Sequence, residues 1–150
     1  MKELLLNIQE RLGSMIPELE YIDKDRGQLS DDGADIAYPC ALLDVKEVAY
    51  TQEGKGTRMA DIQLAVTVAH SQDPSAEETY NVIGLIEDTD NALHLFCVGD
   101  FTPLFCTGVK KISANGGKEC YEMTYRTFAE IGHDTGMTGI VVRDVDIDIV

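Results

Sequence analysis

The sequence has no tryptophan, only four prolines, and 12 lysines and arginines against 27 aspartates and glutamates in 150 residues. The net charge of −15 repels the phosphate backbone of nucleic acids, which argues against tight binding of DNA or RNA. No stretch approaches the roughly 20 consecutive apolar residues of a membrane-spanning helix. Glu3 and Asn7 also interrupt the apolar run that a signal peptide needs. The sequence therefore predicts a cytoplasmic protein with no membrane segment.

Cysteine is also scarce, and its spacing does not match common metal or redox motifs. The four cysteines are Cys40, Cys97, Cys106 and Cys120, with no C-x-x-C pair and no histidine at a zinc-ligand spacing. Each lies in an apolar or alternating segment, so we predict buried or half-buried thiols that pack as small apolar side chains. A redox or metal role is the alternative. A disulfide between Cys106 and Cys120 is geometrically conceivable, but a reducing cytoplasm disfavours it.

Apolar residues make up 44% of the chain, which is enough to build one hydrophobic core. We therefore predict a single domain over residues 1–150. Residues 2–16 predict an amphipathic helix that ends before Pro17. Its expected apolar stripe consists of Leu5, Ile8, Leu12, Met15 and Ile16. Residues 24–35 are polar with only Leu29 to bury, so they predict a mobile surface loop or a segment that orders against a neighbouring subunit.

The middle of the chain predicts a hairpin followed by a helix. Residues 36–50 and 59–70 have strand character, and the glycine-rich stretch 52–58 connects them. That stretch lacks the G-x-x-x-x-G-K-[ST] spacing of a phosphate-binding loop. Ser75 and Glu78 match a capping box, so we expect a helix over residues 75–97.

The last third predicts a second hairpin and an acidic end. Strands are expected over 102–114 and 119–131 because Asn115-Gly116-Gly117 favours a tight turn. Lysines cluster here at positions 110, 111 and 118, either to protect a sheet edge or to contact an acidic neighbouring subunit. Residues 140–150 alternate apolar with acidic side chains, which predicts an acidic strip facing solvent or another subunit. A divalent cation site is the alternative. The basic and acidic groups of this predicted contact are Lys110, Lys111, Lys118, Asp144, Asp146 and Asp148.

These elements together predict an α+β fold, with an antiparallel sheet of two hairpins packed against an N-terminal helix and a central helix. Catalytic chemistry is not indicated. His70, His94 and His133 are scattered over a strand end, a helix and a loop, and no serine lies in a G-x-S-x-G setting. We therefore predict no enzymatic activity, no cofactor and no metal site.

The layout resembles that of tail terminator (tail completion) proteins of long-tailed bacteriophages and prophages. The resemblance covers nearly the whole chain. It rests on the order helix, long loop, hairpin entered by YPCALLDVKEV, strand IQLAVTVAH, capped helix and closing hairpin ending YEMTYRTFAE. It implies a hexameric ring that caps the tail tube, with the tail tube protein and a head-completion protein as partners. It also implies assembly in the host cytoplasm and then a place in the virion tail.

Two other functions remain open at the level of sequence. One is a small-molecule-binding or enzymatic α+β domain with its site between the two hairpins and the central helix, which requires an apolar pocket with converging polar groups. The other is an adaptor or chaperone that binds a single partner chain along a sheet edge. A well-formed apolar pocket favours the first of these, whereas adjacency of the gene to tail tube and tape-measure genes favours the tail terminator role.

Overall fold

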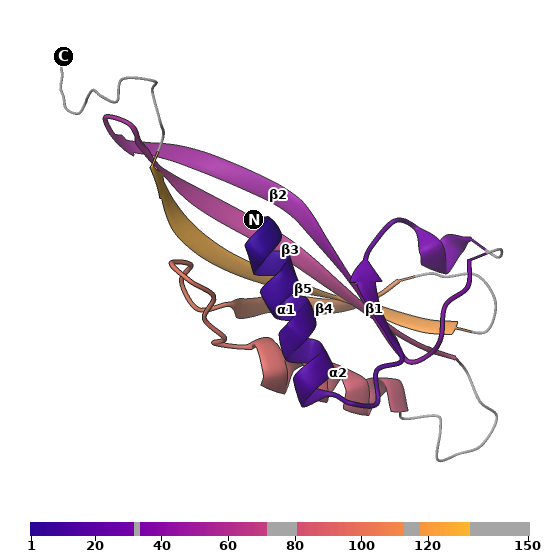
Figure 1. Ribbon diagram of the computed structural model, residues 1–150. Helices are drawn as coiled ribbons and strands as arrows, with labels where there is room; N and C mark the ends of the chain where they lie inside the picture. The colour runs from indigo at the N-terminus through magenta and orange to yellow at the C-terminus, as the bar shows by residue number, and fades with distance from the viewer. Residues whose placement is uncertain (32–33, 72–80, 113–117, 133–150) are drawn as a thin grey trace.

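The computed structural model describes residues 1–31, 34–71, 81–112 and 118–132 (Figure 1). They form two α-helices, one short 3-10 helix and five strands. The order is α1 (Lys2–Met15), β1 (Tyr21–Lys24), η1 (Gln28–Ser30), β2 (Cys40–Gly54), β3 (Thr57–Ser71), α2 (Asn81–Leu93), β4 (Phe105–Ile112) and β5 (Lys118–Gly132). None of the helices in these ranges is long and apolar enough to cross a membrane.

The five strands form one sheet in the order β1-β2-β3-β5-β4, which confirms the predicted α+β class. The β2–β3 and β4–β5 pairs are antiparallel, as predicted, and β3–β5 is antiparallel too. The short strand β1 instead runs parallel to β2, so the sheet is mixed. Parallel neighbours need a long connection, and residues 25–39 supply it, which accounts for the length of the first loop.

Helix α1 forms where the spacing predicted it, although its buried stripe is shifted at both ends. Leu4, Ile8 and Leu12 are the buried residues of the helix, and Ile16 just beyond it is buried as well. Leu5 is only half-buried and Met15 is 49% exposed. The residues of α1 that face the sheet are therefore spaced four apart in the sequence. Burying each of these leucine and isoleucine side chains contributes roughly 1.5–3 kcal/mol.

Helix α2 ends earlier than predicted, at Leu93 instead of residue 97. The predicted start near residue 75 lies outside the described residues. The chain leaves the helix because Leu95 adopts a φ of 67°. Its N–H then donates to the carbonyl of Leu104 at 2.6 Å, and the N–H of Leu104 donates to the carbonyl of Phe96 at 3.0 Å. These long-range hydrogen bonds replace the next helical turn.

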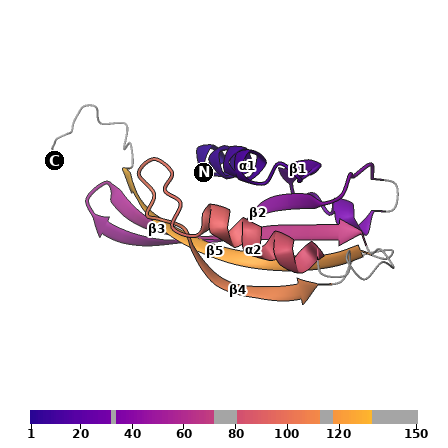
Figure 2. The ribbon, with the colours of Figure 1, turned by 90° about the horizontal axis from the view of Figure 1, so that it is seen from below.

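Both helices pack on the same face of the sheet, and α2 crosses in front of β3 and β5 in Figure 2. The main core lies between the two helices and the sheet. It includes Leu12 of α1, Leu93 of α2, Leu64 of β3 and Met123 of β5. A smaller cluster lies on the opposite face. It consists of Leu29, Cys40, Leu42, Ala69 and Cys120.

The loop after β1 packs against its own sheet, so the prediction of a mobile loop is wrong for residues 24–31. Gln28 is 6% exposed and Leu29 is 7% exposed. The Gln28 side chain accepts the N–H of Arg26 at 2.5 Å and donates to the carbonyl of Lys24 at 2.9 Å. Leu29 covers the smaller apolar cluster on the sheet, which local sequence pattern does not reveal.

All four cysteines are free. Cys40 and Cys120 are buried and Cys106 is half-buried, as predicted, but the prediction is wrong for Cys97, which is exposed because α2 ends before it. Cys106 lies opposite Tyr125 and Cys120 lies opposite Ile112, so the conceivable disulfide does not bridge cross-strand neighbours. Burial raises the pKa of the Cys106 thiol, which keeps it protonated and unreactive.

Candidate assembly surface

The lysines of the predicted contact lie at one edge of the sheet. Lys110 and Lys111 are on the edge strand β4, and their ammonium groups lie 3.7 Å from Glu122 and 3.8 Å from Glu119 on β5. Lys46 approaches Glu122 from the other side at 3.7 Å. The three lysines therefore share two carboxylates within the chain.

These ion pairs leave the lysines accessible to another protein. The side chains of Lys110 and Lys111 are 72% and 63% exposed. Exposed ion pairs of this kind contribute little to stability, so a neighbouring carboxylate competes for them readily. Lys118 begins β5, and its side chain is not among those described. Asp144, Asp146 and Asp148 lie outside the described residues, so the predicted basic–acidic contact stays a prediction.

The three central strands extend well past the helices at one end (Figure 1). We call this part the distal sheet and define it as residues 47–54 of β2, 57–63 of β3 and 126–132 of β5, which are paired with one another. At about 3.3 Å per strand residue, it extends the sheet by roughly 25 Å. The β2–β3 turn forms its tip, which projects beyond the N-terminus of α1 in Figure 1.

Both outer edges of the distal sheet lack a strand partner among the described residues. Pairing of β1 with β2 stops at Leu43, and pairing of β4 with β5 stops at Arg126. Beyond Arg126, the backbone of Thr102 donates to the carbonyl of Phe128 at 2.8 Å and covers one further position. The outer edge of β2 and the outer edge of β5 therefore both have backbone groups without a strand partner among the described residues. The two edges lie on opposite sides of the distal sheet, at the same position along the strands.

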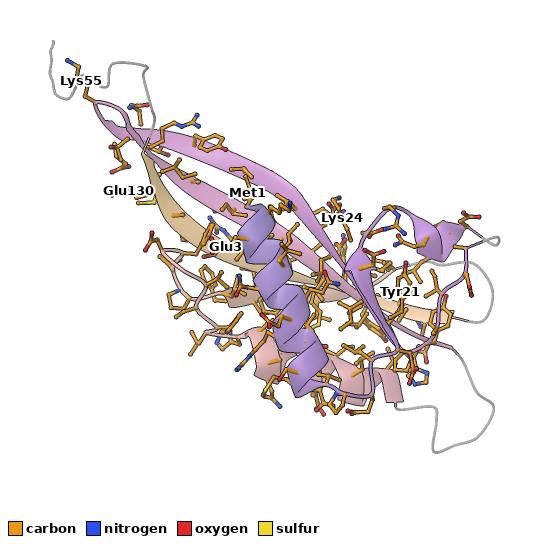
Figure 3. All side chains as sticks on the ribbon, in the orientation of Figure 1. Met1, Glu3, Tyr21, Lys24, Lys55 and Glu130 are labelled. Carbon is orange, nitrogen blue, oxygen red and sulfur yellow. The ribbon has the colours of Figure 1, made fainter. Side chains whose placement is uncertain are left out.

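Side-chain contacts link the two strands at the tip of the distal sheet. The amide of Gln52 donates to the carbonyl of Thr57 at 3.0 Å and also to the carbonyl of Gly54. The guanidinium carbon of Arg58 lies 3.9 Å from the centroid of the Tyr50 ring, a cation–π contact. Tyr50 is nevertheless 45% exposed. Figure 3 shows Lys55 at the outermost point of the tip.

The face of the distal sheet opposite the helices carries polar and charged side chains. Arg126 donates through two nitrogens to the two carboxylate oxygens of Asp61, a bidentate pair. A shallow hollow of about 180 Å³ lies beside this pair, and Glu47, Ala49 and Gln63 complete its lining. Its one guanidinium is already occupied by Asp61, so the hollow has no unpaired cation to offer a ligand.

A second hollow, of about 220 Å³, lies under the first loop, lined by Tyr21, Arg26, Gln28, Asp31, Ala34, Asp35 and Ile36. Arg26 is already paired with Asp23 at 2.6 Å, and this hydrogen bond holds the pKa of the Asp23 carboxyl below its ordinary value. Neither hollow is the apolar pocket between the hairpins and α2 that a small-molecule-binding domain requires.

His70 and His94 lie on separate segments of the described structure, and His70 is the cross-strand neighbour of Glu119. His70 lies near the end of β3, and His133 lies outside the described residues. His94 Nδ1 accepts the backbone N–H of Cys106 at 3.4 Å, which is a structural contact. Within the described ranges, no three histidine, cysteine or acidic side chains are placed to hold a metal ion. The absence of enzymatic activity stays a prediction.

One polar contact fixes α2 to the sheet beside the distal part. The hydroxyl of Tyr125, which is 0% exposed, donates to Asp90 of α2 at 2.8 Å. Burial, followed by the Asp90 carboxylate, raises the pKa of Tyr125 far above its ordinary value. The side chain is therefore a permanent hydrogen-bond donor at neutral pH.

The fold resembles that of a virion protein. A chain in a structure described as the virion of a native gene transfer agent particle matches with a TM-score of 0.60 and 11% sequence identity. The match covers 86% of this chain and 96% of that chain. No protein-family model matches the sequence, and no curated protein matches it. At this identity the likeness shows a common fold and transfers no residue roles.

The tip of the distal sheet is the feature that sequence reasoning missed. The pattern showed a hairpin and a glycine-rich turn, but it did not show that Tyr50 and Arg58 stack or that the turn projects past both helices. Tyr50 and Arg58 lie on opposite sides of the turn, so they become neighbours once the strands pair. Both strands in fact continue to the turn, to Gly54 and from Thr57, beyond the strand segments predicted at 36–50 and 59–70.

Proposed function

We propose that this chain is a structural protein of a phage-like particle and that, within it, the chain acts as a tail terminator. In this role it forms a ring that caps the tail tube and joins the tube to the head connector. The tail tube protein and a head-completion protein are its partners, with assembly in the host cytoplasm before incorporation into the tail. The fold likeness to a chain of a gene transfer agent virion supports the particle role.

The two unpaired edges of the distal sheet carry the proposal of a ring. Strands β2 and β5 are both antiparallel to β3, so they run in the same direction. The free edge of β2 in one copy therefore meets the free edge of β5 in the next copy with the same rotation at every step. A head-to-tail contact of this kind closes into a ring when the rotation per subunit divides a full turn, and a closed ring leaves neither edge free. Six subunits are the number that the resemblance implies.

The test is the assembly state of the purified chain. Native mass spectrometry and negative-stain microscopy at increasing protein concentration are expected to show closed rings. Gold-labelled chain added to tail tubes of the same particle is expected to bind one end only. Thr51 is exposed on β2, so Thr51→Lys places a charge at the free edge and is expected to weaken ring formation. Ser14→Lys, an exposed position on α1, is the matched control.

Other outcomes identify the competing functions. A stable complex with one extended peptide and no self-association favours a sheet-edge adaptor. A chain that stays monomeric at every concentration and labels the whole length of the tubes, or none of it, contradicts the terminator role.

A further inference from the structure

We propose that Leu95, in the segment between α2 and β4, contacts Leu6 of α1 in the next copy of this chain. The contact rests on the proposed ring and adds to it an apolar interaction that strand pairing alone does not supply. We call residues 94–104 the α2–β4 loop. In this proposal the loop of each copy is an interface element.

Leu95 combines two features that are each unfavourable for a leucine. It has a φ of 67°, and no other non-glycine residue in the described ranges has a positive φ. A left-handed residue often follows a helix, but it is usually glycine or asparagine, because a Cβ is strained in that conformation. The Leu95 side chain is also 64% exposed, more than any other large apolar side chain that the structure describes. A strained leucine that its own copy leaves in solvent points to a contact with another chain.

The α2–β4 loop around Leu95 is apolar and well anchored. Only one of residues 95–104 is charged, in a chain that is 26% charged. Charged residues are depleted in the same way at the centres of protein interfaces. The guanidinium carbon of Arg11 lies 4.9 Å from the centroid of the Phe96 ring, which ties the loop to α1. Leu95 and Phe96 also share backbone hydrogen bonds with Leu104, so little order is lost when Leu95 binds a partner.

The loop lies on the flank of the sheet that the proposed ring turns toward the next copy. The N–H of Thr102 donates to the carbonyl of Phe128 at 2.8 Å, which places the loop against the outer edge of β5. In Figure 1 it lies on the far side of β5 from β2. In the ring, this flank faces the β2 flank of the next copy. The paired strands run in the same direction, so the helices of both copies cover the same side of the joined sheet.

Leu6 is exposed on the opposite flank, above β1 and β2. Its side chain is 54% exposed, second only to Leu95 among the large apolar side chains described. Gln9, one helical turn further, donates to the carbonyl of Ile22 on β1 at 3.1 Å, and a Cβ at Gly13 would lie 3.6 Å from the Ile22 side chain. Leu6 shares the side of the helix that carries these two residues. It therefore faces the flank that receives the loop of the neighbouring copy.

The two leucines lie at similar positions along the strands. Leu95 is bonded to the residue before β4, and strand pairing places the start of β4 level with Glu47 of β2. On the other flank, the β1 residue that α1 contacts pairs with Ala41 of β2. Leu6 lies one helical turn nearer the distal sheet (Figure 1). A stagger of a few residues at the joint, which the unpaired stretch 44–54 of β2 accommodates, brings the two leucines together.

Disulfide cross-linking between two cysteine variants tests the contact directly. The exposed Cys97 is first changed to serine in both, which removes a competing thiol. Copies with Leu6→Cys are mixed with copies with Leu95→Cys, and mild oxidation is expected to give covalent dimers that contain one of each. Ile83→Cys, at another exposed apolar position on α2, replaces Leu95→Cys in the control mixture and is expected to give none.

The variant Leu95→Gly separates assembly from stability. Glycine adopts the left-handed conformation without strain, so we expect this variant to unfold at a urea concentration no lower than wild type does. Its self-association is expected to weaken about tenfold, because a buried apolar contact is lost. Leu95→Asn also tolerates this conformation and is expected to behave in the same way. Sedimentation velocity measures association, and Ile83→Ala is the matched control, for which we expect no change.

A double-mutant cycle tests whether Leu6 is the partner of Leu95. Leu6→Ala alone is expected to weaken self-association about tenfold as well. Added to Leu95→Gly, it is expected to cause little further loss, since both changes remove the same contact. Independent effects that multiply to about a hundredfold overturn the assignment of Leu6.

The outcomes separate this contact from the ring itself. Wild-type rings that give no mixed disulfide, or Leu95→Gly rings that assemble like wild type, overturn the contact and leave the ring intact. Disulfides between two Leu95→Cys copies indicate a symmetric contact and overturn it too. A clear loss of stability in both Leu95→Gly and Leu95→Asn shows that the leucine serves its own fold and has the same consequence. A wild type that never exceeds a monomer overturns both proposals.

Discussion

Tyr125 shows how one side chain links a helix to the sheet. Its ring fills the core beneath α2, and its hydroxyl reaches Asp90 at 2.8 Å. Tyr121, Met123, Tyr125 and Thr127 occupy alternate positions of β5 and therefore share a face. The structure buries the last three and half-buries Tyr121. The partner of the hydroxyl, 35 residues away, was not predictable from that alternation.

Removing this hydroxyl is expected to destabilise the protein. Tyr125→Phe leaves Asp90 without its donor in a half-buried site, so we expect the free energy of unfolding to fall by about 1–3 kcal/mol. Urea denaturation measures the loss. Tyr50→Phe is the matched control, since Tyr50 is 45% exposed, and we expect almost no change. Equal stability of Tyr125→Phe and wild type contradicts a contribution from this hydrogen bond.

The same pair predicts a dependence on alkaline pH. The pKa of Tyr125 is raised in the folded state, so the native protein keeps this proton while the unfolded chain loses it near pH 10. Stability from this group is complete below about pH 10 and falls as the pH rises above it. Wild type is therefore expected to lose stability above pH 10 more steeply than Tyr125→Phe, as urea denaturation across that range measures. Parallel curves contradict the raised pKa.

Among the elements, the β2–β3 hairpin depends most on one backbone position. Gly56 in its turn has a φ of 79°, a conformation that side chains with a Cβ disfavour. Gly54, two residues earlier, has an ordinary φ and open space around the position of a Cβ. Position 56 therefore favours glycine, whereas position 54 can accept a residue with a side chain.

This difference gives a matched pair of substitutions. Gly56→Ala is expected to lower the free energy of unfolding by about 1–2 kcal/mol, because alanine resists the left-handed conformation. Gly54→Ala is expected to change it little. Chemical denaturation gives the stabilities, and amide exchange of residues 54–57 reports on the turn itself. If both alanine variants unfold at the same denaturant concentration, the backbone of the turn is not as described.

The whole molecule combines a strongly acidic composition with two exposed lysines on the edge strand β4. Lys110 and Lys111 at β4 are highly exposed and share carboxylates within the chain. Contacts through such groups are screened by salt, whereas strand pairing along the edges of the distal sheet is not. Assembly is therefore expected to weaken with salt without vanishing.

A charge reversal at the β4 edge tests the predicted subunit contact. Lys110→Glu is expected to weaken self-association several-fold at low salt and less at high salt, since it removes an exposed cation from the interface. Lys2→Glu changes the net charge equally at an exposed position on α1 and controls for overall repulsion. Sedimentation velocity measures both. Equal effects of the two variants leave the β4 edge without a role in the subunit contact.

The sequence by itself determined the elements whose pattern is local. The period of apolar residues predicted α1, and the strand character of residues 36–50, 59–70 and 119–131 predicted β2, β3 and β5. The glycine-rich turn fixed the first hairpin. Each of these signals lies within a few residues of the feature that it predicts, so no knowledge of distant segments is required.

Tertiary structure decided the rest, because each remaining feature joins segments far apart in the chain. Leu104 ends α2 by bonding to Leu95, and Leu29 covers apolar residues from three strands, which makes the first loop part of the fold. The candidate assembly surface also depends on how distant segments pair. Sequence reasoning located the lysines of β4 but not the unpaired edges of the distal sheet, since an edge exists only where a neighbouring strand stops.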